Sequence, residues 1–313
     1  MTLTELRYVI AVARERHFGR AAEKCFVSQP TLSVAVKKLE DELGIALFER
    51  NSGDVTVTPL GARIVEQAQR VLEETAAIKQ IAASGKDQLA TPLRVGAIYT
   101  IGPYLFPQLI PAVHKAAPKM PLLLQENYTA RLGELLKSGD VDVVVLSLPY
   151  ADSGIVTQAL YDEPFRVVLP ADHAWHAKKT IPADQLCHET LLLLGAGNCF
   201  RDQVMQTCSR AGKAKSSHIQ QALEGSSLET IRQMVASGIG VTVLPSTAAE
   251  SRSAASPLII TRPFSSPAPS RRIALAWRSS FPRPAAVEAL RRAILACKLP
   301  SVTLLPDARP LAG

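Results

Sequence analysis

Apolar side chains recur every three or four positions in three short stretches near the start of the chain, residues 3–13, 19–25 and 29–43, and this spacing predicts three helices. Residues 51–54 read Asn-Ser-Gly-Asp between two short apolar stretches, which indicates a hairpin turn. Capping signals precede the first and third helices, in the form of Thr2 with Glu5, and Ser28. Three helices followed by a hairpin predict a winged helix-turn-helix over residues 1–58.

A longer helical stretch opens at Pro59 and Gly61 and continues to about residue 83. Its inward positions alternate between spacings of four and three residues, which is the a/d pattern of a coiled coil. These positions are Ile64, Ala68, Val71, Thr75, Ile78 and Ala82. We therefore expect residues 59–88 to form a dimerisation helix and a hinge; the alternative is a helix that packs on its own domain.

From residue 89 the pattern changes to apolar strand candidates that alternate with helical stretches, which is typical of an α/β fold with a mostly parallel sheet. The strand candidates are 93–98, 122–126, 141–148, 167–170, 191–194, 241–244 and 273–277. The helical stretches are 103–117, 131–138, 201–211, 227–237 and 284–297.

The chain is expected to pass from one lobe to a second near 162–166 and to return near 264–271. The boundaries that follow for an effector domain over residues 89–313 are lobe I at 89–162 and 270–299, lobe II at 163–269, and a tail at 300–313. Loops at the carboxyl ends of the strands would surround a site in the cleft between the lobes. The tail contains three prolines and is expected to be poorly ordered.

The net charge of +7 does not by itself indicate DNA binding, because the excess of basic residues lies at the C-terminal end of the chain and not in the predicted helix-turn-helix. Residues 1–66 contain nine basic and nine acidic residues, whereas residues 252–313 contain ten and two. The N-terminus has no signal-peptide pattern, and no apolar run approaches the ~20 residues that span a bilayer. We expect a soluble, cytoplasmic protein whose cysteines are normally reduced.

Two of the five cysteines, Cys199 and Cys208, lie nine positions apart, and Arg201 follows the first. A cation near a thiol favours the thiolate, which attacks peroxides, and a second thiol can capture the resulting sulfenic acid as a disulfide. Nine residues of helix span roughly 13 Å, whereas a disulfide needs Cα atoms within ~7 Å, so oxidation would require this helix to unwind. The alternative for Arg201 is an ordinary ion pair with Asp202 or Glu224. The other cysteines are expected to be small buried hydrophobes, namely Cys25, Cys187 and Cys297.

The first 66 residues resemble the LysR-type transcriptional regulators. The resemblance is carried by four segments, Ala21–Ser33, Leu39–Gly44, Leu47–Arg50 and Thr58–Gly61. It implies a winged helix-turn-helix, a long linker helix, and an α/β effector domain of two lobes that is similar to periplasmic binding proteins. Within this family, Gly-x-Cys-x-Arg-Asp-Gln with a second cysteine nine residues on resembles the peroxide-sensing members.

The resemblance implies an activator of oxidative-stress genes, not an enzyme, that senses hydrogen peroxide through a reversible disulfide between a peroxidatic Cys199 and a resolving Cys208. It implies no cofactor and no metal. The residues that it places around the peroxide are Thr100, Thr129, Asn198, Asp202 and His218. Position 198 departs from the pattern, because many peroxide-sensing members have histidine there.

The same resemblance implies several partners. They are promoter DNA, RNA polymerase, a cellular thiol reductant such as glutaredoxin or thioredoxin, and further copies of the chain in a dimer of dimers. No membrane partner is implied.

In a helix-turn-helix the second helix of the motif, here the helix predicted over residues 29–43, enters the major groove of DNA. Gln29 can pair with adenine there, Thr31 can touch a thymine methyl group, and Arg50 at the start of the wing can contact phosphate or the minor groove. The residues expected on the DNA side are Ser28, Gln29, Pro30, Thr31, Ser33, Lys37, Lys38 and Arg50.

Two other interpretations stay open. The first is a LysR-type regulator that binds a small organic effector between the lobes and has inert cysteines; Cys199→Ser would then leave the ligand response intact. The second is a thiol peroxidase, which would consume peroxide far beyond stoichiometric amounts. A DNA-binding domain has no use in a peroxidase.

Overall fold

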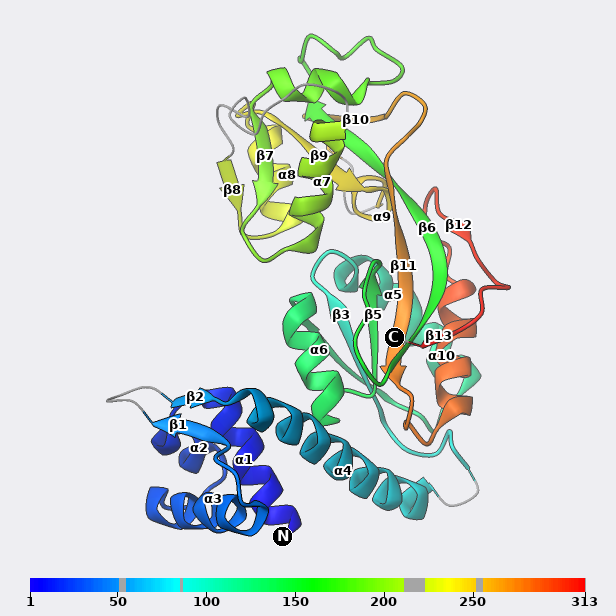
Figure 1. The fold of residues 1–313 in the computed structure, drawn as a ribbon. Helices are drawn as coiled ribbons and strands as arrows, with labels where there is room; N and C mark the ends of the chain where they lie inside the picture. The colour runs from blue at the N-terminus through cyan, green and yellow to red at the C-terminus, as the bar shows by residue number, and fades with distance from the viewer. Residues whose placement is uncertain (51–54, 85–86, 211–222, 252–255, 313) are drawn as a thin grey trace. The chain divides into compact units, whose positions relative to one another are not determined.

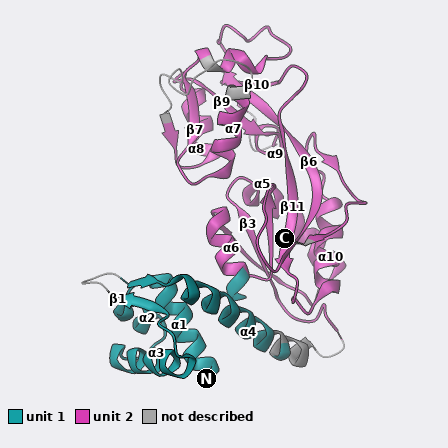
Figure 2. Ribbon diagram, in the orientation of Figure 1, with its two compact units in different colours: residues 1–85, 137–139 teal, residues 86–136, 140–313 magenta. Residues whose placement is uncertain are grey.

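The computed structural model describes residues 1–50, 55–84, 87–210, 223–251 and 256–312. The chain divides into two compact units, residues 1–85 with 137–139 and residues 86–136 with 140–313 (Figure 2). The first unit is helical and carries a two-stranded hairpin, whereas the second is built on a large mixed sheet (Figure 1).

The first unit begins with three short helices whose ends follow the capping signals in the sequence. Thr2 and Glu5 form the expected capping box, and the Ser28 hydroxyl accepts a hydrogen bond from the backbone N–H of Thr31. Gly44 ends the third helix with φ 70°, a left-handed conformation that favours glycine. The helices are α1 (Leu3–Glu15), α2 (Phe18–Lys24) and α3 (Gln29–Leu43).

A hairpin follows the three helices. Strands β1 (Phe48–Arg50) and β2 (Val55–Val57) pair antiparallel, with Phe48 opposite Val57. The buried carboxylate of Glu40 on α3 accepts hydrogen bonds from the backbone N–H groups of Leu47 and Phe48, at 2.8 and 3.2 Å. This contact fixes the start of the hairpin against the recognition helix, and the predicted winged helix-turn-helix is confirmed.

Helix α4 (Pro59–Ser84) is the predicted long helix. Its first half packs on the core of its own unit, where Ala68 is 3% exposed and Ile64 is partly buried. Farther along, Val71 and Ile78 are 37% and 67% exposed. The alternative of packing on its own domain therefore holds at Ile64 and Ala68, and the exposed seam positions lie farther along the helix, from Val71 on. The side chain of Ala82 is outside the described residues.

Across the described residues of the second unit, eleven strands form one sheet, whose main path runs β4-β3-β5-β11-β6-β9-β7-β8. Its strands are β3 (Leu93–Ile98), β4 (Leu122–Asn127), β5 (Val143–Ser147), β6 (Ile155–Pro170), β7 (Leu191–Leu194), β8 (Leu223–Gly225), β9 (Val241–Pro245), β10 (Ile259–Pro263), β11 (Ser270–Arg278), β12 (Thr303–Leu304) and β13 (Leu311–Ala312). Its helices are α5 (Gly102–Ala116), α6 (Thr129–Ser138), α7 (Cys199–Arg210), α8 (Leu228–Ala236), α9 (Ser246–Ala249), α10 (Pro284–Leu295) and the 3-10 helix η1 (Ala183–His188).

The strand β6 is the structural link between the two lobes of this unit (Figure 1). Its first part pairs antiparallel with β11, and its last part pairs antiparallel with β9 and β10. Pairing is parallel within lobe I, between β3 and its neighbours β4 and β5, and within lobe II, between β7 and its neighbours β8 and β9. The prediction of a mostly parallel sheet was wrong for the crossing strands, because these join the lobes with antiparallel ladders.

Each lobe has its own hydrophobic core. The core of lobe I gathers side chains from β3, β5, α5 and α10, and the core of lobe II gathers side chains from β6, β7, α8 and β9. The two-lobed α/β effector domain that the sequence predicted is confirmed by this arrangement.

The tail was predicted to be poorly ordered, and this prediction was wrong. Thr303 and Leu304 in β12 pair with Tyr161 and Asp162 of β6, and β13 pairs with β6 nearer its start. The Leu305 N–H also donates to the Leu160 carbonyl at 2.8 Å. Backbone pairing with a long strand orders a proline-containing segment that has little apolar pattern of its own.

Candidate functional site

Cys199 lies in the first turn of α7, which begins two residues earlier than the sequence predicted. The preceding loop passes through Gly197, whose φ of 90° is a left-handed conformation suited to glycine. The thiol is free and half-buried. Although α7 belongs to lobe II, Cys199 packs against the core of lobe I. This one side chain therefore contacts both lobes.

The hydroxyl of Thr129 is the polar group that reaches the thiol. Thr129 is the first residue of α6, two residues after the end of β4, and its Oγ1 donates to Cys199 Sγ at 3.6 Å. A hydroxyl at this position can donate a hydrogen bond to the sulfur or to a small polar molecule beside it. The sheet edge at the carboxyl ends of the lobe I strands thus supplies a hydrogen-bond donor to a thiol that belongs to lobe II.

Thr100 follows the neighbouring strand β3, so parallel pairing of β3 with β4 brings it to the same sheet edge as Thr129. Its side chain turns inward and is 2% exposed. Thr100 Oγ1 accepts a hydrogen bond from Arg271 Nη1 at 2.7 Å, and its carbonyl accepts a second from Nη2 at 2.9 Å.

Arg271 is the centre of a fully buried network between the lobes. Its Nε donates to a carboxylate oxygen of Glu163 at 2.8 Å, and both side chains are 0% exposed. The other oxygen of Glu163 accepts hydrogen bonds from the backbone N–H and the hydroxyl of Thr247 in lobe II. The guanidinium also lies 5.1 Å from the ring centre of Phe200, the residue after Cys199. A buried guanidinium whose hydrogen bonds are satisfied thus contacts the residue that follows Cys199 in the chain.

Arg201 was expected to activate the thiolate, or alternatively to form an ordinary ion pair. Its guanidinium pairs with Glu224 and donates to the Leu194 carbonyl at 2.9 Å. Asn198 donates from Nδ2 to the Gly195 carbonyl at 3.2 Å, which ties the loop before Cys199 to itself. Asp202 is exposed on the first turn of α7.

Gln203 lies one helical turn after Cys199 and therefore on the same face of α7. Its Nε2 donates to the Ser147 hydroxyl of lobe I at 2.9 Å. Its Oε1 is buried and has no hydrogen-bond donor among the described residues. A buried carbonyl oxygen without a donor can accept a hydrogen bond from a small polar ligand.

The resolving position, residue 208, lies in the same helix as Cys199. Nine residues at about 1.5 Å per residue separate the two backbone positions by roughly 13 Å, so this helix is incompatible with a disulfide between them. The side chains of Cys208 and Cys187, and the whole of His218, are outside the described residues.

On the first unit, the predicted DNA-side residues lie at the start and along one face of α3. Gln29, Pro30 and Thr31 are exposed, Ser28 and Thr31 share a hydrogen bond between their hydroxyls at 2.8 Å, and Ser33 is partly exposed. The opposite face is buried through Leu32, Val36 and Leu39. The predicted DNA-side residues of α3 therefore face away from the core.

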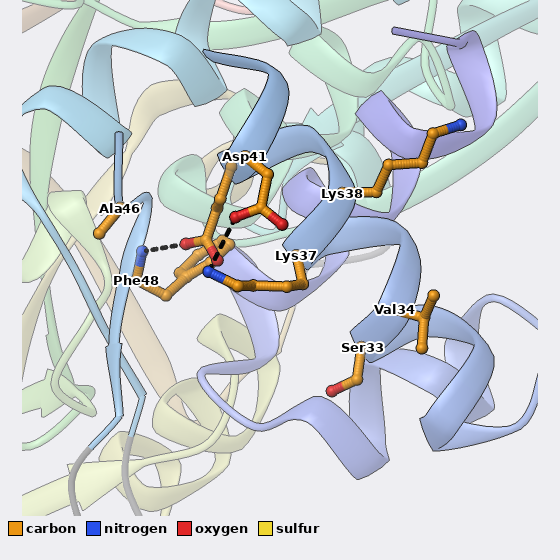
Figure 3. A pocket seen from close by; sticks show the side chains of 8 residues that line it. Ser33, Val34, Lys37, Lys38, Asp41, Ala46 and Phe48 are labelled. Atoms are coloured by element: carbon orange, nitrogen blue, oxygen red, sulfur yellow. Dashed lines mark hydrogen bonds and ion pairs between the residues drawn. The ribbon is translucent and has the colours of Figure 1, made fainter. Parts of the chain in front are cut away.

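Farther along α3, a shallow hollow lies between this helix and the hairpin (Figure 3). Lys37 pairs with Asp41 at 2.9 Å, and Lys38 with Glu5 at 3.3 Å; both lysines are exposed, so these pairs are weak. Arg50 is in β1, but its side chain is outside the described residues.

Two family models cover most of the chain. The model of the bacterial regulatory helix-turn-helix protein of the lysR family matches residues 3–62, and the model of the LysR substrate binding domain matches residues 86–297. The DNA-binding transcriptional dual regulator OxyR of Escherichia coli K12 is 40% identical over 296 residues, which are 95% of each chain. The chain belongs to the OxyR group of the LysR family.

Solved structures of other OxyR proteins agree with this assignment. Full-length OxyR from Pseudomonas aeruginosa with a cysteine-to-aspartate substitution is 54% identical, with a TM-score of 0.74 over 95% of this chain and 96% of that one. A cysteine-to-serine mutant of Corynebacterium glutamicum OxyR with hydrogen peroxide bound is 34% identical, with a TM-score of 0.64 over 94% and 91% of the two chains.

In this OxyR-group chain, sequence reasoning missed the Arg271–Glu163 pair. The available signal was the carboxylate of Glu163 in the crossing segment between the lobes, together with the two adjacent arginines Arg271 and Arg272 where the chain returns. Among the described residues, no cluster of His, Cys, Asp or Glu could hold a metal ion. None of the helices described here is both long and apolar enough to cross a membrane.

Proposed function

We propose that this chain is a hydrogen peroxide-sensing transcriptional activator that binds promoter DNA and is switched by a reversible Cys199–Cys208 disulfide. The observation that carries the proposal is the half-buried free thiol of Cys199 with the Thr129 hydroxyl 3.6 Å from its sulfur. The OxyR relatives support it, since one carries bound hydrogen peroxide at a comparable fold.

The first chemical step is attack by the Cys199 thiolate on one peroxide oxygen. The O–O bond breaks, the sulfur becomes a sulfenic acid, and the other oxygen takes a proton and leaves as water. Thr129 can donate a hydrogen bond to the bound peroxide, and Gln203 Oε1 can accept one. In the second step the Cys208 thiol attacks the sulfenic sulfur, a disulfide forms, and hydroxide leaves with a proton as a second water.

The second step forces α7 to unwind. Phe200 and Val204 lie on this helix and are 2% and 1% exposed, so they are packed in the core of lobe II. Removing each from the core costs about 1.5–3 kcal/mol unless it finds a new apolar partner. The oxidised effector domain therefore repacks, and α4 carries the change to the winged helices.

The remaining partners belong to the same proposal. The exposed seam on the second half of α4 supports a dimer, and the family supports a dimer of dimers that contacts RNA polymerase. A thiol reductant such as glutaredoxin or thioredoxin resets the switch, and each disulfide forms once per signal, so the chain is not an enzyme. A DNA partner supports the bacterial cytoplasm as the location of the chain.

The test is stoichiometric oxidation followed by peptide mass mapping. Hydrogen peroxide should produce a Cys199–Cys208 disulfide, and Cys208→Ser should leave a sulfenic acid that dimedone traps at Cys199. Footprinting with reduced and oxidised protein should show different promoter contacts.

Two outcomes would contradict the proposal. A stable oxidation product at Cys25 or Cys297 would refute the assignment of the reactive thiol. A full transcriptional response to peroxide in Cys199→Ser would mean that the signal enters elsewhere, as in a regulator that binds an organic effector.

A further inference from the structure

Two tyrosines stand beside the candidate site and take no part in the chemistry proposed above. Tyr99 directly precedes Thr100 at the end of β3, and Tyr128 directly precedes Thr129 at the end of β4. Parallel pairing of these strands brings both rings to one sheet edge. Their ring centres lie 5.2 Å apart at an interplanar angle of 77°, which is a favourable edge-to-face contact.

The aromatic pair also touches the loop that leads to the thiol. A Cβ on Gly197 would lie 3.8 and 3.9 Å from two ring carbons of Tyr128. The ring of Tyr128 therefore packs on the backbone two residues before Cys199, and the hydroxyl of the next residue, Thr129, reaches the sulfur.

Burial divides the surroundings of the thiol into a closed side and an open side. Thr100 and Phe200 are both 2% exposed, and Cys199 itself packs on the lobe I core. Tyr99 and Tyr128 are 42% and 44% exposed, and Gly197 is exposed as well. The two rings therefore lie on the open side of these surroundings.

We propose that Tyr99 and Tyr128 form a steric rim that admits hydrogen peroxide to Cys199 and excludes bulky alkyl hydroperoxides. The proposal rests on Cys199 being the peroxide-reactive thiol. Neither phenol hydroxyl has a hydrogen bond among the contacts of the described residues, so the rings themselves form the rim. The edge-to-face contact and the packing on Gly197 hold both rings in place at low entropic cost.

The experiment compares rate constants of Cys199 oxidation by hydrogen peroxide and by tert-butyl hydroperoxide, whose bulk is not aromatic and cannot stack on the rings. The full-length protein is mixed rapidly with each oxidant, quenched with an alkylating reagent and analysed by mass spectrometry. Tyr128→Ala should raise the ratio of the tert-butyl rate to the hydrogen peroxide rate by roughly tenfold or more, as expected when a steric exclusion is removed. Tyr99→Ala should raise the same ratio.

Two matched variants complete the set. Tyr128→Phe keeps the ring and should leave the ratio unchanged, whereas Tyr128→Trp enlarges it and should lower the ratio further. Both tyrosines are substantially exposed, so the variants should fold, and far-UV circular dichroism checks this.

The outcomes separate this inference from the function on which it rests. A ratio that stays constant in both alanine variants, while hydrogen peroxide oxidises Cys199 normally, overturns the rim. Equal loss of both rates in Tyr128→Ala also overturns it, because the ring would then position the loop and not select the oxidant. If hydrogen peroxide fails to oxidise Cys199 in the unaltered protein, the proposed function falls and the rim with it.

Discussion

Thr100 and Thr129 both lie at the carboxyl end of the lobe I strands, but replacing each by valine should affect a different property. One substitution should slow oxidation of the thiol, and the other should lower the stability of the fold. Thr129 is half-buried, and its hydroxyl donates a hydrogen bond to the sulfur of Cys199. Thr100 is buried and accepts a hydrogen bond from the Arg271 guanidinium. Valine has nearly the same shape as threonine but neither donates nor accepts.

For Thr129→Val the expected loss is kinetic. A neutral hydrogen bond contributes roughly 0.5–1.5 kcal/mol, and lost from the transition state this slows oxidation by roughly 2- to 13-fold. The stability of the fold should hardly change, because the Thr129 side chain is partly solvated.

For Thr100→Val the expected loss is thermodynamic. Arg271 keeps its contacts with Glu163 and with the carbonyl of residue 100, but Nη1 loses its acceptor in a site where the arginine is 0% exposed. Hydrogen bonds to charged groups contribute about 1.5–3 kcal/mol. For a domain of this size that lowers the melting temperature by roughly 3–12 °C.

Stopped-flow oxidation by hydrogen peroxide and thermal unfolding by circular dichroism separate the two effects. Thr56→Val, on the exposed face of β2, is the matched control and should change neither quantity. An unchanged melting temperature for Thr100→Val would show that Arg271 does not depend on that hydroxyl. Oxidation of Thr129→Val at the unaltered rate would show that the peroxide site is built from other residues.

Four further outcomes are expected. Burial raises the pKa of the Cys297 thiol to about 11, so its thiolate fraction at pH 8 is roughly 100-fold below that of an ordinary cysteine, and iodoacetamide should label it correspondingly slowly by mass spectrometry. Thr31→Ala should reduce the discrimination between operator and random DNA by roughly 1–3 kcal/mol. Lys37→Ala should weaken binding to operator and to random DNA equally, and should lower the slope of log affinity against log salt concentration by about one. The opposite pattern in binding titrations would refute the assignment of Thr31 to base contacts and of Lys37 to phosphate contacts. Truncation before Thr303 should expose the edge of β6 and lower the melting temperature. Ile78→Asp should shift sedimentation toward the monomer if the second half of α4 forms the dimer seam.

Much of the fold could be predicted because local signals and tertiary packing agree. The capping box at Thr2 and Glu5, the cap at Ser28 and the glycine at position 44 mark helix ends by hydrogen bonding and backbone conformation alone. The strands β3 and β7 were predicted with their observed bounds, since buried strands are continuous apolar runs.

The crossing strand could not be predicted at its full length for a physical reason. Asp162 and Glu163 interrupt its apolar pattern, and their partners are Arg272 and Arg271, more than 100 residues later in the chain. A sequence pattern contains no information on which distant cation compensates a buried carboxylate. The order of the tail likewise depends on backbone pairing with β6. Backbone hydrogen bonds produce no periodic pattern of apolar residues, so the sequence of the tail does not indicate this pairing.

The candidate site divides in the same way. The positions of Thr100 and Thr129 follow from their place after adjacent parallel strands, which sequence order can indicate. The direction of each side chain does not follow, and the structure turns Thr100 toward Arg271 and Thr129 toward Cys199. The ion pair of Arg201 with Glu224 was one of two interpretations that spacing alone left open.

The unbroken pairing of β6 has a mechanical consequence. Every residue from Ile155 to Pro170 lies in one strand, and its partners pass from β11 to β9 and β10 without a gap at the boundary between the lobes. A large opening of the lobes would have to break these ladder hydrogen bonds, so a response by rigid clamshell motion is unfavourable. In the switch proposed above, the first conformational step is instead the unwinding of the short helix α7, a small moving part, before the rest of the domain repacks. Its rate should therefore depend only weakly on solvent viscosity, and such a sensor would respond at nearly the same speed in dilute buffer and in crowded cytoplasm.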